Sequence, residues 1–193
     1  MSSGEDAAIG EGRPRLAHRV ATRADIPAIR ALIDLAIAGN MPAFLSPREV
    51  AAARATMGLD TRLIDDGCYY IIEAATAEGP VAVGCGGWSR RRTLYGGDHS
   101  AGRDDSLSDP ATEAARIRAM YVHPDWTRRG VGSMLLALGE AAARAEGFRT
   151  IELGATLPGE PLYKARGYVE FGRDETRRAD GVTNLIIRMR KTL

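Results

Sequence analysis

The sequence predicts a mixed α/β domain of the α+β class, and three stretches carry that prediction. Residues 130–147 place small and apolar side chains at helical spacing, which indicates an amphipathic helix. Residues 68–74 are rich in the aromatic and β-branched side chains that strands favour. Residues 150–155 alternate between the two sides of a half-buried strand. Helices and strands are therefore interleaved, without an internal repeat.

The N-terminal part supplies a strand and two helices. Residues 16–22 are read as a short strand, and Asp25 is placed to cap the helix that follows. Residues 46–57 are expected to form a second helix, because Ser46 and Glu49 have the spacing of a capping box.

The other elements follow from turn residues and side-chain alternation, and they give the order β-α-α-β-β-β-α-β-α-β-β. Glycines make the prediction of a strand at 81–88 weaker, unless they are there because another group must approach its backbone closely. The expected ranges are 81–88 and 116–123 for strands, 160–165 for a short helix, and 168–173 and 182–190 for a terminal pair of strands.

Length and composition favour one soluble domain over residues 16–193, preceded by a disordered tail at 1–15. Hydrophobic residues make up 45% of the chain and charged residues 26%, with a formal net charge of +1. Nothing in this balance favours nucleic acid or an anionic membrane as a partner. Since no membrane-length apolar run or signal sequence is evident, the expected location is cytoplasmic.

Cysteine and histidine usage predicts no metal site. Cys68 and Cys85 lie in apolar stretches and are read as small buried hydrophobes. The three histidines, His18, His99 and His123, do not have the spacing of metal ligands.

Residues 117–136 are the most informative stretch. An apolar strand leads into a Pro-Asp turn, then two arginines and a Gly-x-Gly, and then the amphipathic helix. The first turn of a helix has unpaired N–H groups and a partial positive charge, so it can bind a phosphate or pyrophosphate. On the turn alone, a tight connection with solvated arginines is an equally good interpretation.

The same stretch resembles the GCN5-related N-acetyltransferase (GNAT) superfamily. The family's Gln/Arg-x-x-Gly-x-Gly/Ala turn corresponds to residues 127–132, with Thr127 as a departure at the first position. The resemblance implies a central mixed, mostly antiparallel sheet flanked by helices, with a splayed strand pair that holds acetyl-CoA. It also implies that the backbone of Met120, Tyr121 and Val122 pairs with the pantetheine arm, and that the pyrophosphate is bound by Arg128, Arg129, Gly130, Val131, Gly132 and Ser133.

A second family feature is the Tyr-x-x-x-Gly-Tyr pattern formed by Tyr163, Gly167 and Tyr168. The resemblance places the Tyr163 hydroxyl near the thioester sulfur, where a phenol can protonate the departing thiolate as a general acid. The alternative for Tyr163 is a core aromatic residue with its hydroxyl at the rim.

The general base is the weakest part of the pattern. Many family members carry an acidic residue on the central strand, but this chain has Arg116 and Arg118 there. Glu73 and Glu113 are the candidate bases, and a solvated or ion-paired carboxylate is the alternative for each.

The resulting hypothesis is an acetyl-CoA-dependent N-acetyltransferase without a metal, acting by direct attack of a primary amine in a ternary complex. The acceptor is a small molecule, an amino acid or a peptide; the sequence leaves a homodimer open. The alternative is a non-catalytic acyl-CoA-binding sensor or interaction module, whereas a nucleotide-binding α/β protein is disfavoured because no βαβ repeat is evident. Residues 89–112 are expected to be a mobile flap beside the acceptor pocket or a solvated linker.

Overall fold

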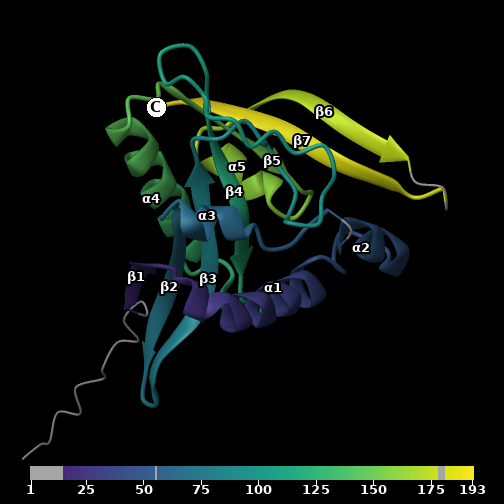
Figure 1. Cartoon of the computed structure of the whole chain (residues 1–193). Coiled ribbons are helices and arrows are strands. Elements are labelled where there is room, and N and C mark those ends of the chain that lie inside the picture. Colours follow the sequence, from purple (N-terminus) through teal and green to yellow (C-terminus); the bar gives the residue numbers. More distant parts are fainter. Residues whose placement is uncertain (1–14, 55, 178–180) are drawn as a thin grey trace, which may run out of the picture.

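A single seven-stranded sheet organises the structure, a computed structural model that describes residues 15–54, 56–177 and 181–193 (Figure 1). The strand order is β1-β2-β3-β4-β5-β7-β6, and every neighbouring pair is antiparallel except β4 and β5. The mixed, mostly antiparallel fold is confirmed, and the tail expected at 1–15 lies outside the described residues except for Arg15. The strands are β1 (Leu16–Val20), β2 (Tyr69–Thr76), β3 (Gly79–Ser89), β4 (Ala115–Val122), β5 (Thr150–Ala155), β6 (Val169–Arg177) and β7 (Thr183–Thr192).

Helices cover both faces of the sheet. Apolar side chains of α1 and α3 pack on one face, and those of α4 and α5 pack on the other. The short helix α3 was not expected from the sequence. The helices are α1 (Ile26–Asn40), α2 (Pro47–Arg54), α3 (Thr61–Asp65), α4 (Val131–Ala145) and α5 (Glu160–Ala165).

The capping box at Ser46 and Glu49 is confirmed. The Ser46 N–H donates to the Glu49 carboxylate over 2.7 Å, and the Glu49 N–H donates to the Ser46 hydroxyl over 3.4 Å. These bonds occupy N–H groups that the first turn of α2 leaves without helical partners. The helix then runs from Pro47 to Arg54, shorter than the range expected.

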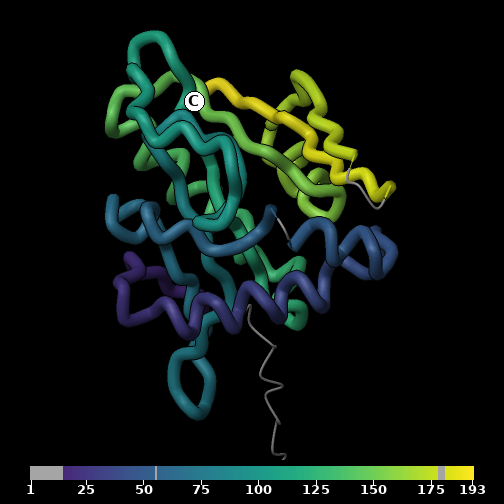
Figure 2. The backbone as a smooth tube through the Cα atoms, turned by 45° about the vertical axis from the view of Figure 1, so that its right-hand side comes forward, coloured from purple at the N-terminus to yellow at the C-terminus, as the bar shows by residue number. Residues whose placement is uncertain are grey.

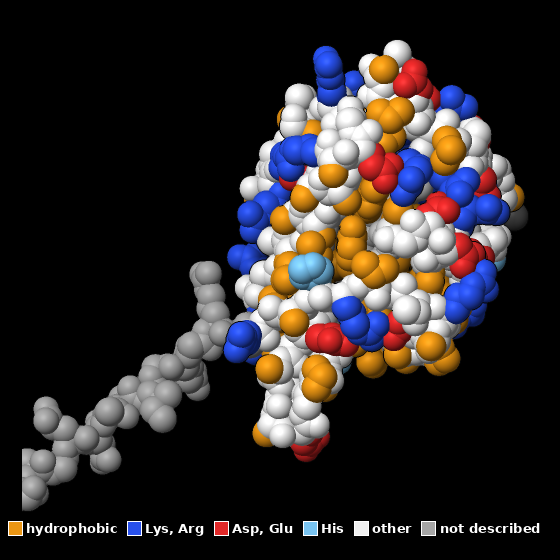
Figure 3. Space-filling view, turned by 60° about the vertical axis from the view of Figure 1, so that its left-hand side comes forward, with side chains coloured by type: hydrophobic (Ala, Val, Ile, Leu, Met, Phe, Trp, Pro, Cys, Tyr) orange, Lys and Arg blue, Asp and Glu red, His pale blue; other side chains and the backbone are white. Residues whose placement is uncertain are grey.

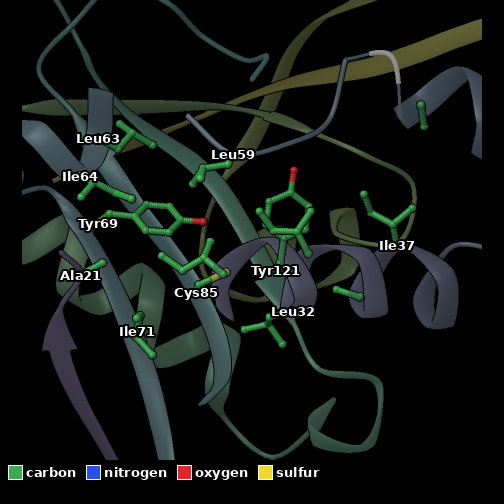
Figure 4. Close-up of a cluster of buried hydrophobic side chains, with 14 of the residues drawn as sticks. Ala21, Leu32, Ile37, Leu59, Leu63, Ile64, Tyr69, Ile71, Cys85 and Tyr121 are labelled. Carbon is green, nitrogen blue, oxygen red and sulfur yellow. The ribbon is translucent and has the colours of Figure 1, made fainter. Parts of the chain in front are cut away.

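Alternation along β2 divides the core between the two faces. Tyr69 and Ile71 lie in the cluster on the α1 side, while Ile72 lies in a cluster on the α4 side. In Figure 4 the sulfur of Cys85 lies between the rings of Tyr69 and Tyr121. Both cysteines of the chain are free thiols in buried positions, as the sequence predicts.

Glycines in β3 let other parts of the chain approach its backbone. A Cβ atom at Gly84 would lie 2.3 Å from Cγ1 of Val131 on α4, and one at Gly87 would lie 2.1 Å from the Cys68 carbonyl oxygen. Real side chains do not tolerate such separations. The strand therefore forms despite its glycines, because α4 and the chain before β2 pack directly against it.

Residues 89–112 are held in place by polar contacts. The Arg92 N–H donates to the Ser106 carbonyl, and the Thr93 N–H donates to the Asp104 carbonyl, so the segment doubles back on itself. Arg103 on this segment forms an ion pair with the buried Asp60, which precedes α3. Figure 2 shows the segment, in teal, lying against the blue chain of α3. Such contacts join residues far apart in the sequence, so the composition of the segment does not reveal them.

Charged side chains of both signs are interspersed on the face that Figure 3 shows. This distribution fits the small net charge of the sequence. None of the helices in the described part of the chain combines the length and apolarity that crossing a bilayer requires.

Candidate active site

The site begins where β4 and β5 separate. These parallel strands pair only at Ala115 with Ile151 and at Arg116 with Glu152. Beyond these pairs β4 continues to Val122 and β5 to Ala155, each still joined to the strand on its outer side. The opening leaves a length of β4 edge without a strand partner, and unpaired edge groups can pair with an added extended chain.

A bulge in β4 sharpens this opening. Ala119 has a φ of 49°, and the register between β3 and β4 shifts between Cys85 and Gly87. The Tyr69 hydroxyl donates to the Ala119 carbonyl over 2.9 Å. Ala119 therefore packs on the α1 side, while the next residue, Met120, packs on the α4 side. Bulges of this kind redirect side chains beside functional sites.

A cavity of about 90 Å³ lies in the opening, and we call it the β4–β5 cavity. It connects the two faces of the sheet, because it is lined by residues of both clusters. The lining comprises residues 56–58, 94–96 and 117–121, together with Leu153, Gly154, Thr156, Tyr163 and Ile186.

Tyr163 of α5 lines this cavity. Its side chain is buried, and its ring meets that of Tyr168 edge to face at 6.0 Å. Within the described chain its hydroxyl has no hydrogen-bond partner. Burial raises the pKa of Tyr163 to about 12, because the charged phenolate would be poorly solvated. The phenol is thus protonated at neutral pH and able to donate.

The turn before α4 is where the sequence predicts the pyrophosphate to bind. Arg128 and Gly130 have φ values of 62° and 92°, and Gly130 is the N-cap of α4 without a side-chain cap. Both residues are exposed, as is Arg129, whose guanidinium lies 5.2 Å from the ring centre of Trp126. The N–H groups of the first turn therefore face a region with surplus positive charge, which suits an anion.

A third arginine, which the sequence analysis missed, adjoins this turn. Arg166 follows α5, and its Nε donates to the Ser133 hydroxyl over 3.1 Å. The residue lies within the same Tyr-x-x-x-Gly-Tyr pattern that identified Tyr163, but nothing in the spacing shows that α5 packs against the start of α4. That packing is visible at Gly132, where a Cβ atom would lie 2.7 Å from Cδ2 of Leu162.

The two candidate bases are not brought to the β4–β5 cavity. Glu113 accepts two hydrogen bonds from Arg92, at 2.7 and 2.9 Å, and these lower the pKa of Glu113 to about 2. Glu73 on β2 forms an ion pair with Arg19 of β1 at 2.8 Å. Neither lines the cavity, so the alternative interpretation of both as ion-paired carboxylates describes their positions. Neither is retained as a proposed base.

Comparison with known protein families identifies the family of this chain. The model of the acetyltransferase (GNAT) domain family matches residues 65–170, more than half of the chain. The chain belongs to the GNAT family. The resemblance inferred from the turn and from Tyr163 is thereby confirmed, and this GNAT domain is a member of a family of acetyltransferases.

Solved GNAT structures share the fold over nearly the whole chain. A protein from Rhodopseudomonas palustris, described as a GCN5-related N-acetyltransferase and class-II aminotransferase, is 22% identical, with a TM-score of 0.62 and coverage of 97% of this chain and 100% of its own. The PaiA N-acetyltransferase from Thermoplasma acidophilum, solved with coenzyme A, is 10% identical, with a TM-score of 0.57 and coverage of 93% and 99%. The yncA protein of Salmonella typhimurium, solved with its cofactor acetyl-CoA, is 18% identical, with a TM-score of 0.58 and coverage of 92% and 94%. No curated protein matches the sequence.

Two of these structures therefore hold coenzyme A or acetyl-CoA on the same fold. Within the described residues, no group of three or more His, Cys, Asp or Glu side chains is arranged to hold a metal ion.

Proposed function

We propose that this GNAT domain transfers the acetyl group of acetyl-CoA to the nitrogen of a primary amine, by direct attack in a ternary complex. The observation that carries the proposal is that Tyr163, whose hydroxyl has no hydrogen-bond partner within the described chain, lines a cavity at the opening between β4 and β5. An acyl group, an attacking amine and a proton donor can meet there.

The cofactor is placed by two backbone features. The turn around Arg128 to Ser133 binds the pyrophosphate through first-turn N–H groups, with Arg166 beside it. The edge of β4 at Met120 to Val122, which has no strand partner, pairs with the amide groups of the pantetheine arm, although the Val122 carbonyl also accepts from Asn40. The thioester then reaches the β4–β5 cavity, where Tyr163 lies.

The chemical step needs no covalent enzyme intermediate. The nitrogen lone pair of the neutral amine attacks the thioester carbonyl carbon, the C–S bond breaks, and the sulfur takes the phenolic proton of Tyr163. The proton that the acetylated nitrogen releases restores the phenol, with solvent as the carrier. The products are the N-acetyl amine and coenzyme A with a free thiol. Both cysteines are buried, and burial raises the pKa of each thiol, which opposes a thiolate nucleophile.

A non-catalytic acyl-CoA sensor is the second candidate. It is favoured by one observation, namely that Glu73 and Glu113 are engaged in ion pairs away from the cavity. An acceptor that enters as the free amine does not require a protein base, so this observation does not exclude catalysis.

Thiol release separates the two functions. The purified chain is incubated with acetyl-CoA and a panel of primary amines, amino acids and short peptides, and the acetylated product is identified by mass spectrometry. Coenzyme A binding is measured by calorimetry on the same sample. Amine-dependent thiol release with a matching N-acetyl product supports the enzyme. Tight cofactor binding without any product across the panel overturns it in favour of the sensor.

A further inference from the structure

One side of the β4–β5 cavity is formed by residues to which no role in cofactor binding has been given. Leu153 and Tyr163 belong to the cluster on the α4 side, whereas Gly154 faces the opposite side of the sheet. A Cβ atom at Gly154 would lie 2.9 Å from Cδ1 of Tyr95, so the tyrosine ring closes the cavity there. We call four of the side chains that line the cavity the acceptor wall, namely Thr56, Leu94, Tyr95 and Ile186. Met57, Ala119 and Tyr121 also line the cavity on the α1 side.

The acceptor wall is apolar, aromatic or hydroxylic. Arg118 is the single charged side chain among the described residues that line the cavity. Its terminal nitrogens already donate to the carbonyls of Thr93 and Gly96, at 2.8 and 2.6 Å, and to Asp60 at 2.8 Å. The guanidinium is thus paired with a buried carboxylate, which also binds Arg103. An anion that entered the cavity would have to compete with these bonds.

A carboxylate lies directly behind the acceptor wall. The Tyr95 hydroxyl donates to Oδ2 of Asp174 on β6 over 3.1 Å. The other carboxylate oxygen of Asp174 lies 3.3 Å from Nε of Arg188 on β7. An amine near Tyr95 therefore lies beside an aromatic ring, and Asp174 behind that ring offsets the charge of Arg188.

We infer that the acceptor is a small primary amine with an apolar body and no carboxylate next to the amine. The inference rests on the proposed acetyltransferase activity and names its substrate class. The acceptor wall accepts the apolar body, and the volume of about 90 Å³ limits its size. A carboxylate on the same carbon as the amine would be buried, and Arg118, the one charged side chain among the described lining residues, already uses its terminal nitrogens in other bonds, which makes that burial strongly unfavourable.

Three acceptors of nearly equal shape test the inference on the intact chain: 3-methylbutylamine, L-leucinamide and L-leucine. The second and third differ in the charge of one group and in the pKa of the amine, so each rate is referred to the concentration of the free amine. Initial rates of thiol release at saturating acetyl-CoA give kcat/KM for each. We expect the amine and the amide to exceed leucine by about a hundredfold or more, because a buried charge without a partner is penalised severely. Leucine used as well as leucinamide overturns the inference, while the acetyltransferase activity stands.

A variant pair tests the role of Asp174. Asp174→Asn removes the charge that offsets Arg188, so the preference for 3-methylbutylamine over leucine should fall roughly tenfold. Glu175→Gln is the matched control, because its exposed side chain lies on the opposite face of the same strand and should leave the ratio unchanged. Since the readout is a ratio within one variant, a loss of folded protein does not affect it. Equal ratios in both variants contradict a role for Asp174. Cofactor binding without turnover of any acceptor overturns the proposed function, and the inference with it.

Discussion

Arg118 and Asp60 form an ion pair of 2.8 Å in which each side chain is only 2% exposed. The pair joins β4 to the chain before α3, and Arg103 binds the same carboxylate from residues 89–112. One aspartate therefore holds two arginines that approach from different parts of the chain. Through the Thr93 and Gly96 carbonyls, Arg118 also fixes the backbone on either side of Tyr95.

Replacing Asp60 with Asn should lower the free energy of unfolding by about 3–5 kcal/mol, because two buried or half-buried guanidinium groups lose their common partner. Chemical denaturation measures the loss. Asp98→Asn is the control: its carboxylate is exposed and accepts from Thr61, so about 1 kcal/mol is expected. Limited proteolysis should also cut residues 97–107 faster in the Asp60 variant. Equal stability of the two variants would show that the network contributes little.

Tyr163→Phe should lower kcat by roughly 10–10³-fold, the range of general-acid effects. The affinity for coenzyme A should barely change, because the hydroxyl has no partner in the described chain and acts on the departing sulfur. Single-turnover rates and calorimetry measure the two quantities. Wild-type rates, where chemistry is rate-limiting, would refute the role.

The pH profile offers an independent check on Tyr163. A general acid acts in its protonated form, and burial raises its pKa to about 12 from the ordinary value of 10.0. The kcat of the wild-type chain should therefore not fall as the pH rises from 7 to about 10.5. A decline with an apparent pKa near 10 would indicate a solvent-exposed phenol or a different acid.

Gly132→Val should reduce coenzyme A affinity, but its Cβ atom also meets Leu162 on α5. We therefore expect the double variant Gly132→Val/Leu162→Ala to regain stability while its affinity remains about tenfold or more below wild type, because the anion still cannot reach the backbone N–H groups. Leu162→Ala alone is the control and should bind nearly normally. Recovery of affinity in the double variant would mean that Gly132 acts only through packing.

Glu113→Gln and Glu73→Gln should each leave kcat/KM within about twofold of wild type, because neither carboxylate lines the cavity and a distant charge acts weakly through solvent. The Glu113 variant should also differ from wild type in its stability at acidic pH. Because Arg92 lowers the pKa of Glu113 to about 2 from 4.5, the carboxylate contributes stability above pH 4.5 that is lost as the pH falls toward 2. Unfolding measured at pH 7 and pH 3 should therefore show a smaller acid loss in Glu113→Gln. A large fall in kcat/KM for either variant would restore that residue as a base.

Local patterns predicted the local parts of this structure. The strand at 150–155 and the helix at 160–165 have the expected limits, since alternation and turn residues act over a few positions. The turn before α4 was found for the same reason. The five-residue helix α3 was missed because it is too short to show a period, although Asp60 accepts a capping bond from Arg62.

The rest of the site depends on contacts between distant residues. The partner of Glu113 is Arg92, twenty-one positions away, and no pattern in the sequence distinguishes an ion-paired carboxylate from a free one. Leu94 and Tyr95 line the cavity, and Arg118 of β4 donates to the Thr93 and Gly96 carbonyls on either side of them. The same contacts join residues 89–112 to β4 and to the chain before α3, which the polar composition of the segment does not reveal.

The glycines of β3 also limit which sequences can adopt this fold. A Cβ atom at Gly84, Gly86 or Gly87 would come within 2.7 Å of a neighbouring atom. The neighbour belongs to α4 at Gly84, to β4 at Gly86 and to the chain before β2 at Gly87. Alanine at Gly87 would require the backbone before β2 to move, and alanine at Gly84 or Gly86 would displace the side chain of Val131 or Met120. In a library of random variants selected for folded protein, substitutions at these three positions should be rarer than anywhere else. They should be rarer even than in the apolar core, where one hydrophobic residue can often replace another.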